Sequence, residues 1–504
     1  MTRTPSYDTA GSVEREQARR QADARGVPAD IMLPRILLVV ATVLLVLVGL
    51  VMVFSASTIE AISQGESIFS YVSKQAIFVV VGGLAAFVIA KFIPYHVWQS
   101  GPWFWAGWGI AMLMLLAVPF VGTEILGAKR WIFIGGMSIQ PTEFAKIALV
   151  VAASGILYRY RNELSTTKDT LVALVVLVVL PLAFLYKTQS DMGSAIVILM
   201  GVFAVMWIGE VPLRVIVPAF LVVALAGVIG MVGYRADRVS VWLNPWNDGE
   251  GGYGTGYQMI RSFYAFAEGG LFGVGLGNSR EKFLYLPEAE TDFIFSVIGE
   301  ELGLIGALFV IALFLVVLYA GLRIAHHAPD SFGSTMAGGL TVMLVGQAFL
   351  NMACATGLFP TTGKPLPFIS SGGSSILASL FIIGLVMSVS VGSNVLTPYE
   401  RRRNDLNVIR VEQSPRRRGE KPEPRTRENG SNSLVRIPGE RFASSERASD
   451  GDRRRGGAGA ISPSSRAEGR RKVREGASRA DDAARASRRE RARQRALDSE
   501  RRRR

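Results

Sequence analysis

The stretch ILLVVATVLLVLVGLVMVF, residues 36–54, decides the fold class. It carries no charged side chain from end to end. As a helix it would rise about 28 Å, which matches a hydrocarbon core about 30 Å thick. Within lipid only a helix satisfies the backbone of an isolated run. The stretch therefore predicts a transmembrane helix.

Further apolar runs follow between Arg35 and Pro398. The fifth to seventh are short or separated only by brief turns. We expect an all-α integral membrane protein, a bundle of about ten transmembrane helices with a large extracytoplasmic loop, residues 234–291, between spans seven and eight. The ten predicted spans lie near 36–54, 75–93, 103–121, 142–158, 171–186, 194–209, 212–233, 292–321, 337–358 and 374–397.

The charge of the chain is concentrated in its last part. The whole chain has a net charge of +14, and residues 399–504 contain 32 Lys and Arg against 17 Asp and Glu. This composition predicts a disordered basic cytoplasmic tail. Such a tail could lie on an anionic leaflet or bind an acidic partner. Nucleic acid is not expected, because the tail lacks interleaved aromatic residues. The three predicted parts are residues 1–34, the membrane domain 35–398, and 399–504.

Basic residues collect on one predicted side of the membrane, which the positive-inside rule makes the cytoplasm. Both termini are then cytoplasmic, and 234–291 lies outside. Lys129 and Arg130, in GAKRW, are exceptions on the outer side, which favours a functional role, although short outer loops tolerate such bases. The cytoplasmic bases are Arg19, Arg20, Arg25, Arg35, Arg159, Arg161, Lys168, Arg323 and Arg401 to Arg403.

Polar residues at the start of predicted span four form a candidate site. In QPTEFAKIALV, Glu143 and Lys146 are three residues apart and so share a helix face. Ions at this depth should face the bundle interior or a wet cavity. They could form a salt bridge that packs two helices, or line a polar cavity below Lys129 and Arg130.

Two further segments contain candidate cavity-lining residues. Asp191 lies at the start of predicted span six, where it could instead cap the helix. The segment PTTGKPLPFISSGGSS, residues 360–375, is too rich in Pro and Gly to be helical before about Ser374. It is typical of a re-entrant or mouth-lining loop, and Ser370, Gly372 and Gly373 are its candidate residues.

The stretch PEAETDFIFSVIGEELGLIGAL, residues 287–308, places acids at the start of predicted span eight and within it. Asp292 follows Glu290 closely, and Glu300 and Glu301 are eight and nine residues beyond Asp292. Helix capping could explain Asp292 but not the deeper pair. Glu290 and Glu300 are further candidate cavity-lining residues. The one cysteine, Cys354, and three histidines do not form a metal-site pattern, so no metal cluster is predicted.

These segments together resemble the SEDS proteins (shape, elongation, division and sporulation). The resemblance rests on GAKRWIFIGGMSIQPTEFAKIALV, GYQMIRSFYAFAEGGLFGVGLGNS, KFLYLPEAETDFIFSVIGEELGLIGAL and TGLFPTTGKPLPFISSGGSS, in that order. The GLGNS…KFLYLPEA run is more similar to the cell-division branch of the family than to its elongation branch. Glu290 stands where the family often has His, and Ser371 where it usually has Tyr.

The resemblance implies a peptidoglycan glycosyltransferase that polymerises lipid II and releases undecaprenyl pyrophosphate, with inversion at the anomeric carbon. It implies Asp292 as general base, with its pKa raised by nearby acids and burial. Glu143 and Lys146 match the family's acid and base, and Lys129, Arg130 and Lys146 are the cations available to the pyrophosphate. No cofactor is certain, although a divalent cation could assist.

The implied setting is the plasma membrane of a bacterium, at the division septum. The implied partners are lipid II, the undecaprenyl-linked glycan and a class B penicillin-binding protein, with other division proteins possible through the tail. The residues alone leave open an elongation-type polymerase, a lipid II flippase or other transporter, and a non-enzymatic scaffold.

Overall fold

The computed structural model describes residues 29–99, 101–125, 128–134, 137–159, 173–234, 236–248 and 250–393. The predictions for the first 28 residues, for Arg161 and Lys168, and for the basic tail concern residues outside these ranges. All of the predicted spans fall wholly or largely inside them.

The structure confirms the helical membrane fold. Within the ranges given above, seven helices are long and apolar enough to cross a bilayer, and three shorter apolar helices coincide with predicted spans five to seven. The ten elements are α2 (Ala29–Ser63), α3 (Ser70–Phe92), α4 (Pro102–Val121), α5 (Pro141–Arg159), η2 with α7 (Val175–Val179 and Leu180–Gln189), α8 (Met192–Ile208), α9 (Leu213–Tyr234), α12 (Ile294–His326), α13 (Ser331–Ala355) and α14 (Gly373–Gly392).

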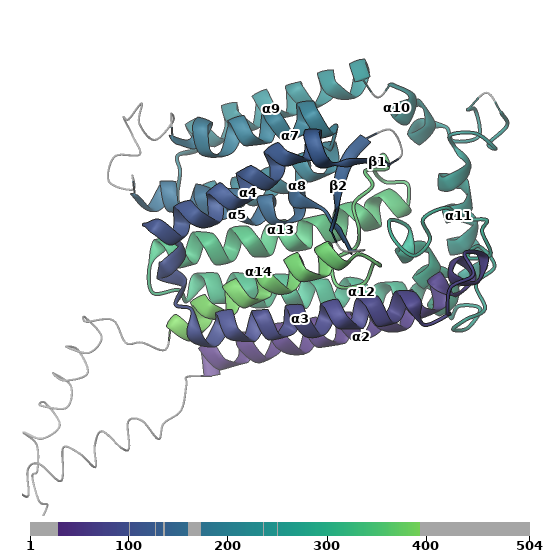
Figure 1. Cartoon of the computed structure of the whole chain (residues 1–504), viewed down its shortest axis with the longest axis horizontal. Helices are drawn as coiled ribbons and strands as arrows, with labels where there is room; N and C mark the ends of the chain where they lie inside the picture. The colour runs from purple at the N-terminus through teal and green to yellow at the C-terminus, as the bar shows by residue number, and fades with distance from the viewer. Residues whose placement is uncertain are drawn as a thin grey trace, which may run out of the picture. The chain divides into compact units, whose positions relative to one another are not determined.

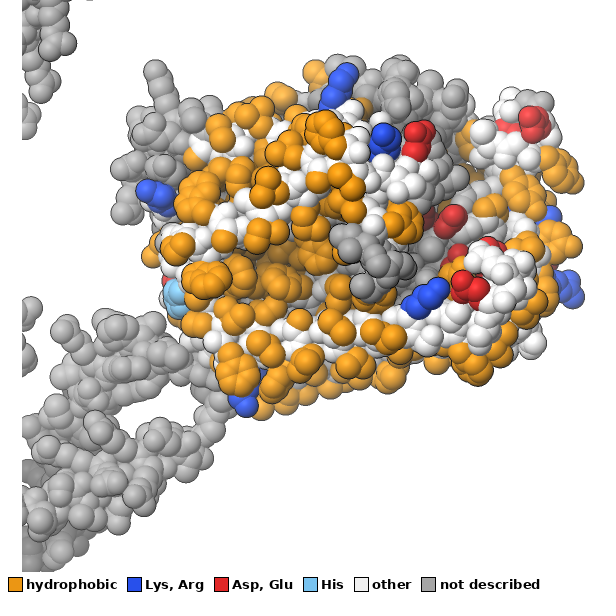
Figure 2. All heavy atoms as spheres, in the orientation of Figure 1, with side chains coloured by type: hydrophobic (Ala, Val, Ile, Leu, Met, Phe, Trp, Pro, Cys, Tyr) orange, Lys and Arg blue, Asp and Glu red, His pale blue; other side chains and the backbone are white. Residues whose placement is uncertain are grey.

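The long helices lie side by side along one direction (Figure 1). The main packed pairs are α3 with α14, α2 with α12, and α8 with α13. Helices α5 and α13 are buried along most of their length, whereas only a small part of α3 is buried. Thus α5 and α13 form the interior of the bundle, and apolar side chains cover much of the outer face in Figure 2.

One end of the bundle carries additional short elements. Helices α10 (Ala236–Leu243) and α11 (Tyr257–Gly269) lie there, and α11 runs across the direction of the long helices in Figure 1. A short 3-10 helix, η1 (Tyr95–Trp98), links α3 to α4 elsewhere. Acidic side chains on the face shown in Figure 2 gather mainly toward the end with α11.

The same end contains a three-stranded sheet that the all-helical expectation did not include. Strands β1 (Thr123–Ile125), β2 (Ala128–Ile134) and β3 (Met137–Ile139) pair antiparallel in chain order, with Ile132 opposite Ile139. The sheet connects the end of α4 to the start of α5. It therefore fixes the position of Lys129 and Arg130, which both lie on β2.

Candidate active site

The backbone around Asp292 is attached to two other segments just before α12 begins. The carbonyl oxygen of Asp292 accepts a hydrogen bond of 2.7 Å from Nδ2 of Asn351, on α13. The preceding carbonyl, of Thr291, accepts one of 2.6 Å from Oγ of Ser370. The carbonyl of Glu290 accepts one of 2.8 Å from the Ser371 amide. Three consecutive carbonyls are thus held, which fixes the backbone that carries the Asp292 side chain.

The segment that holds the Glu290 and Thr291 carbonyls is the irregular stretch 360–372, most of which is buried. Asn351 also donates a 2.8 Å hydrogen bond to the Lys364 carbonyl, so one amide group joins this segment to Asp292. Gly363 has a φ of +66°, and a Cβ added there would lie 3.4 Å from Oδ2 of Asp292. Glycine is favoured at this position because other residues are strained at this φ.

Lys364 is a buried cation that the sequence reasoning did not single out. Its Nζ lies 2.8 Å from Oδ2 of Asp191 and 2.6 Å from Oγ of Ser194. Asp191 is the N-cap of α8, as the capping alternative expected, because its Oδ1 accepts from the Ser194 amide. The stem of Lys364 passes over Gly193, where an added Cβ would lie 2.7 Å from its Cγ. Asp191 therefore caps a helix and also binds a cation that faces the Asp292 region.

The two bases of the GAKRW segment occupy different environments. Arg130 is half-buried, and its guanidinium donates hydrogen bonds of 3.0 Å to the carbonyls of Gln189 and Ser190. It thereby holds the turn between α7 and α8, immediately before Asp191. Lys129 is exposed and lies opposite Glu124 on β1. The structure thus brings Arg130 to the Asp191 region but leaves Lys129 at the surface.

Glu143 and Lys146 form a buried ion pair on α5, with 2.6 Å between Oε2 and Nζ. Nζ of Lys146 also donates a 2.6 Å hydrogen bond to Oε1 of Gln347. Gln347 in turn donates to the carbonyl of Pro365, in the same segment as Lys364. The pair is therefore joined to the segment that packs on Asp292. Oε1 of Glu143 is buried without a hydrogen-bond partner among the described residues.

The electrostatics of Asp292 suit proton transfer near neutral pH. Burial raises the pKa of its carboxyl group, and Glu288 raises it further, whereas Lys364 and Arg130 lower it, giving a value of about 6. Burial also raises the pKa of Glu290 to about 7. Burial raises the pKa of Asp191, but the charges of Lys364 and Arg130 outweigh burial and hold this pKa at about 2. Asp292 can therefore exchange a proton near pH 6, while Asp191 stays ionised.

The other candidate residues have structural contacts. Ser370 Oγ accepts from the Leu366 amide while it donates to Thr291. Gly373 begins α14, and an added Cβ would lie 2.4 Å from the Phe78 ring. Gly372 is its N-cap residue. Glu300 is fully buried, and its carboxylate accepts hydrogen bonds from residues 279–281.

A polar pocket of about 300 Å³ lies elsewhere, lined by residues such as Tyr158, Glu210 and Asp330. It lies near the end of α5 and the start of α13, whereas Asp292 lies near the start of α5 and the end of α13. It is therefore separate from the candidate site. Within the described ranges, no group of three His, Cys, Asp or Glu side chains could hold a metal ion.

The fold and the site define a polytopic helical membrane protein. One end of its bundle holds buried cations and a carboxyl group whose pKa lies near neutral pH. A family model described as "Cell cycle protein", for FtsW, RodA and SpoVE, matches residues 35–395. The chain belongs to this family, as its resemblance to the SEDS proteins predicted.

Curated relatives span the same region. Stage V sporulation protein E of Bacillus subtilis (strain 168) is 37% identical over 363 residues, which cover 71% of this chain and 97% of that protein. A probable peptidoglycan glycosyltransferase FtsW of Trichlorobacter lovleyi is 38% identical over 364 residues, 71% and 93% of the two chains.

Solved structures agree in fold. A chain from a work titled "Structural coordination of polymerization and crosslinking by a peptidoglycan synthase complex" matches with a TM-score of 0.57 and 27% identity, covering 71% of this chain and 98% of that one. The rod shape determining protein RodA of Thermus thermophilus matches with a TM-score of 0.50 and 26% identity, covering 70% and 95%.

Proposed function

We propose that the chain is a peptidoglycan glycosyltransferase that polymerises lipid II into glycan strands during cell-wall synthesis. The observation that carries this proposal is the half-buried Asp292, attached through three consecutive carbonyls and close to Lys364 and Arg130. Relatives named as peptidoglycan glycosyltransferases FtsW support the reaction class. Both substrates are lipid-linked, which accounts for a polar site at the end of a membrane bundle.

In the proposed reaction, Asp292 is the general base. The sugar hydroxyl of one substrate attacks the anomeric carbon of the other and forms a new glycosidic bond. The bond from that carbon to the pyrophosphate oxygen breaks, and undecaprenyl pyrophosphate leaves with the electron pair. Asp292 takes the hydroxyl proton, a contribution typically worth about 10² to 10⁴ in rate. Attack opposite the leaving group inverts the anomeric carbon.

The charge that develops on the leaving pyrophosphate requires cations near it. Arg130 and Lys364 are the cations that act on Asp292. Lys146 is connected to the same segment through Gln347, and Lys129 is exposed on the neighbouring strand. We assign Lys364 and Arg130 the closest electrostatic role, and Lys146 with Glu143 a role in holding the 360–372 segment.

The proposed topology places both termini in the cytoplasm of a bacterium and residues 234–291 outside. We further propose that the protein works at the division septum with a class B penicillin-binding protein that cross-links the new strands. The similar chain from a complex that coordinates polymerisation and crosslinking supports such a partner. The motifs that resemble the cell-division branch support the septum.

The test measures glycan synthesis from purified lipid II by the full chain, co-purified with its penicillin-binding partner. Native protein is compared with Asp292→Ala, with lipid II binding measured separately on both. We expect polymer from the native protein, and binding without polymer from a folded Asp292→Ala. Polymer from the variant would overturn the role of Asp292. If neither made polymer but both moved lipid II between vesicle leaflets, the polymerase assignment itself would be wrong.

A further inference from the structure

Helix α12 is interrupted close to the candidate site. Gly303 has φ +68° and ψ −168°, so the helix consists of a short piece, residues 294–302, and a longer piece that continues to His326. Asp292 lies immediately before the short piece. A break leaves carbonyl and amide groups without helical partners, which is costly inside a membrane protein unless other groups bind them.

The loop that follows α11 supplies both kinds of partner. The amides of Val274 and Gly275 donate hydrogen bonds of 2.9 and 3.0 Å to the carbonyls of Glu300 and Glu301. The amides of Leu304 and Ile305 donate to the carbonyls of Gly270 and Leu271, at 2.9 and 3.2 Å. The loop therefore satisfies the open backbone groups on both sides of the break.

This contact requires very close approach of two backbones. A Cβ added at Gly273 would lie 2.1 Å from the Glu301 carbonyl oxygen, and one at Gly269 would lie 2.0 Å from the Gly299 oxygen. At Gly303 an added Cβ would lie 2.4 Å from the Gly273 nitrogen. Larger side chains would push the loop out of the break.

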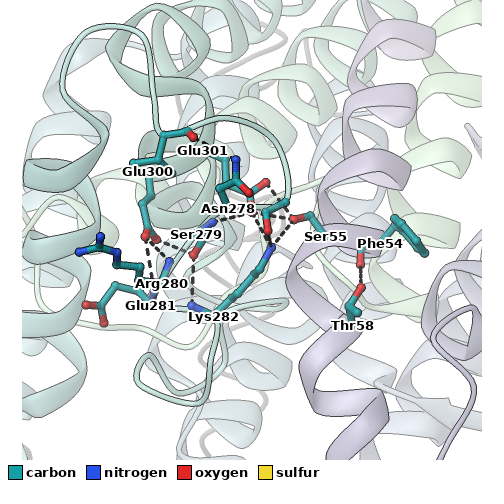
Figure 3. Close-up of polar contacts among 12 residues, drawn as sticks. Phe54, Ser55, Thr58, Asn278, Ser279, Arg280, Glu281, Lys282, Glu300 and Glu301 are labelled. Carbon is teal, nitrogen blue, oxygen red and sulfur yellow. Dashed lines mark hydrogen bonds and ion pairs between the residues drawn. The ribbon is translucent and has the colours of Figure 1, made fainter.

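Glu300 and Glu301 occupy the carboxyl end of the short helix, where the helix dipole disfavours acids. Residues 279–282 of the same loop bind both carboxylates, as Figure 3 shows. Glu300 accepts hydrogen bonds from Ser279 Oγ and the Arg280 amide, of 2.6 and 2.5 Å. Glu301 lies 3.0 Å from Nζ of Lys282.

Lys282 joins three segments. Besides Glu301, its Nζ donates to the Gly277 carbonyl at 2.6 Å and to Ser55 Oγ on α2 at 3.1 Å. Ser55 itself donates to Glu301 at 2.6 Å. Lys282 and Glu301 are almost completely buried. The ion pair therefore attaches the short helix to the loop and to α2 at the same point.

We propose that Lys282 and Glu301 are positioning residues for the reaction of Asp292: they hold the short helix 294–302 against α2 and the 269–282 loop, and so hold Asp292 against the 363–371 segment. The inference rests on the proposed function. Glu301 is nine residues from Asp292, about 14 Å along the helix. A tilt of about 5° at Glu301 would move Asp292 by about 1 Å, a misplacement that can cost about 10²-fold in rate.

The test compares native protein, Asp292→Ala, Lys282→Met and the double variant Lys282→Met/Glu301→Gln, each as full chain with its penicillin-binding partner. The double variant is needed because Lys282→Met alone leaves a buried carboxylate unpaired and can unfold the protein. The matched control is Lys74→Met/Glu66→Gln, which removes an exposed ion pair. Polymerisation of lipid II is measured across pH, and amide hydrogen exchange is measured without substrate.

We expect the double variant to lose about 10- to 100-fold in kcat with little change in KM. The acid limb of its pH–rate profile should move to lower pH. Burial is the largest cause of the raised pKa of Asp292, and a displaced Asp292 would be less buried. The pKa of Asp292 also responds to Glu288, Lys364, Arg130 and Asp191, which the variant retains. Exchange should rise at Gly275, whose amide binds the Glu301 carbonyl beside the break, and also at Ser371, which donates to Glu290.

Faster exchange at Gly275 with no change at Ser371, kcat or the acid limb would show a local structural role and overturn the inference. An active native protein with an inactive Asp292→Ala keeps the proposed function even then. An inactive native protein whose Ser371 exchange still responds to the double variant would reject the function but keep the coupling between Lys282 and the Asp292 segment.

Discussion

Replacing Asp292 by Asn should stabilise the folded protein while it abolishes polymerisation. Asp292 has a folded-state pKa of about 6, above its ordinary value of 3.8. Between these values the folded state binds more protons than the unfolded state, so stability falls as pH rises from about 3.8 to about 6. The full cost of keeping the carboxylate ionised is about 3 kcal/mol above pH 7. Asn has nearly the same shape and carries no such cost.

The size of the gain should therefore depend on pH. We expect Asp292→Asn to be more stable than the native protein by about 2 kcal/mol at pH 5 and about 3 kcal/mol at pH 7.5. The assay is thermal denaturation in detergent at both pH values, since stability differences shift the melting temperature by a few degrees per kcal/mol. Glycan synthesis from lipid II is measured on the same samples.

Asp248→Asn provides a control of opposite sign. Backbone hydrogen bonds from Gly252 and Gly256 lower the pKa of Asp248 to about 2. Its contribution to stability is present above pH 3.8 and disappears as pH falls toward 2, so Asn should destabilise at pH 7.5. Equal melting temperatures of Asp292→Asn and native protein at both pH values would refute the burial argument. Polymer made by Asp292→Asn would refute its role as base.

Three further outcomes follow from the same contacts. Lys364→Met should lower the free energy of unfolding by about 3 to 5 kcal/mol, because Asp191 is left buried and unpaired. Lys364→Met/Asp191→Asn should recover much of this stability in the same melting assay. Equal melting temperatures of the single and double variants would contradict the pairing. Gly303→Ala should lower the melting temperature and the polymer yield, whereas Gly83→Ala should change neither, because Gly83 has open space around it. Equal melting temperatures and yields of the two variants would mean that the break tolerates a side chain. Arg130→Ala should lower the free energy of unfolding by about 1 to 3 kcal/mol, because it leaves two carbonyls without their hydrogen bonds. Replacing the exposed Lys129 by Ala should lower it by less than about 0.5 kcal/mol. The reverse order would show that Lys129 is the base that holds the structure.

The fold was largely predictable because lipid imposes long apolar runs. Spans such as 36–54 have no other stable form in a bilayer, and their helices appear where the hydropathy placed them. The strands β1 to β3 were not predicted because they are short and held by pairing with one another rather than by an apolar period. The break at Gly303 was also not predicted. The stretch GEELGLIG is compatible with a continuous helix, and only its contacts with the loop after α11 show the break.

The site was predictable in part. Glu143, Lys146 and Asp292 were noticeable because ionisable residues are rare at the depth of the spans. Lys364 was overlooked because the prolines and glycines around it indicated an irregular segment. The prediction for that segment therefore concerned its backbone and not its side chains. A lysine within an apolar Pro-rich loop was the available signal. The structural role of Glu300 depends on residues 279–281, and no local pattern connects those segments.

The pairing of Asp191 with Lys364 has a consequence for biogenesis. Ribosomes deliver α8 to the membrane well before residue 364 is made, so during synthesis Asp191 lacks its ion-pair partner Lys364. The Glu143 and Lys146 pair is local and can form at once, but its connection to Pro365 also waits for the last loop. A nascent chain arrested after α13 would therefore hold Asp191 without its ion-pair partner, so this end of the bundle gains its final contacts only after the 360–372 segment has been made.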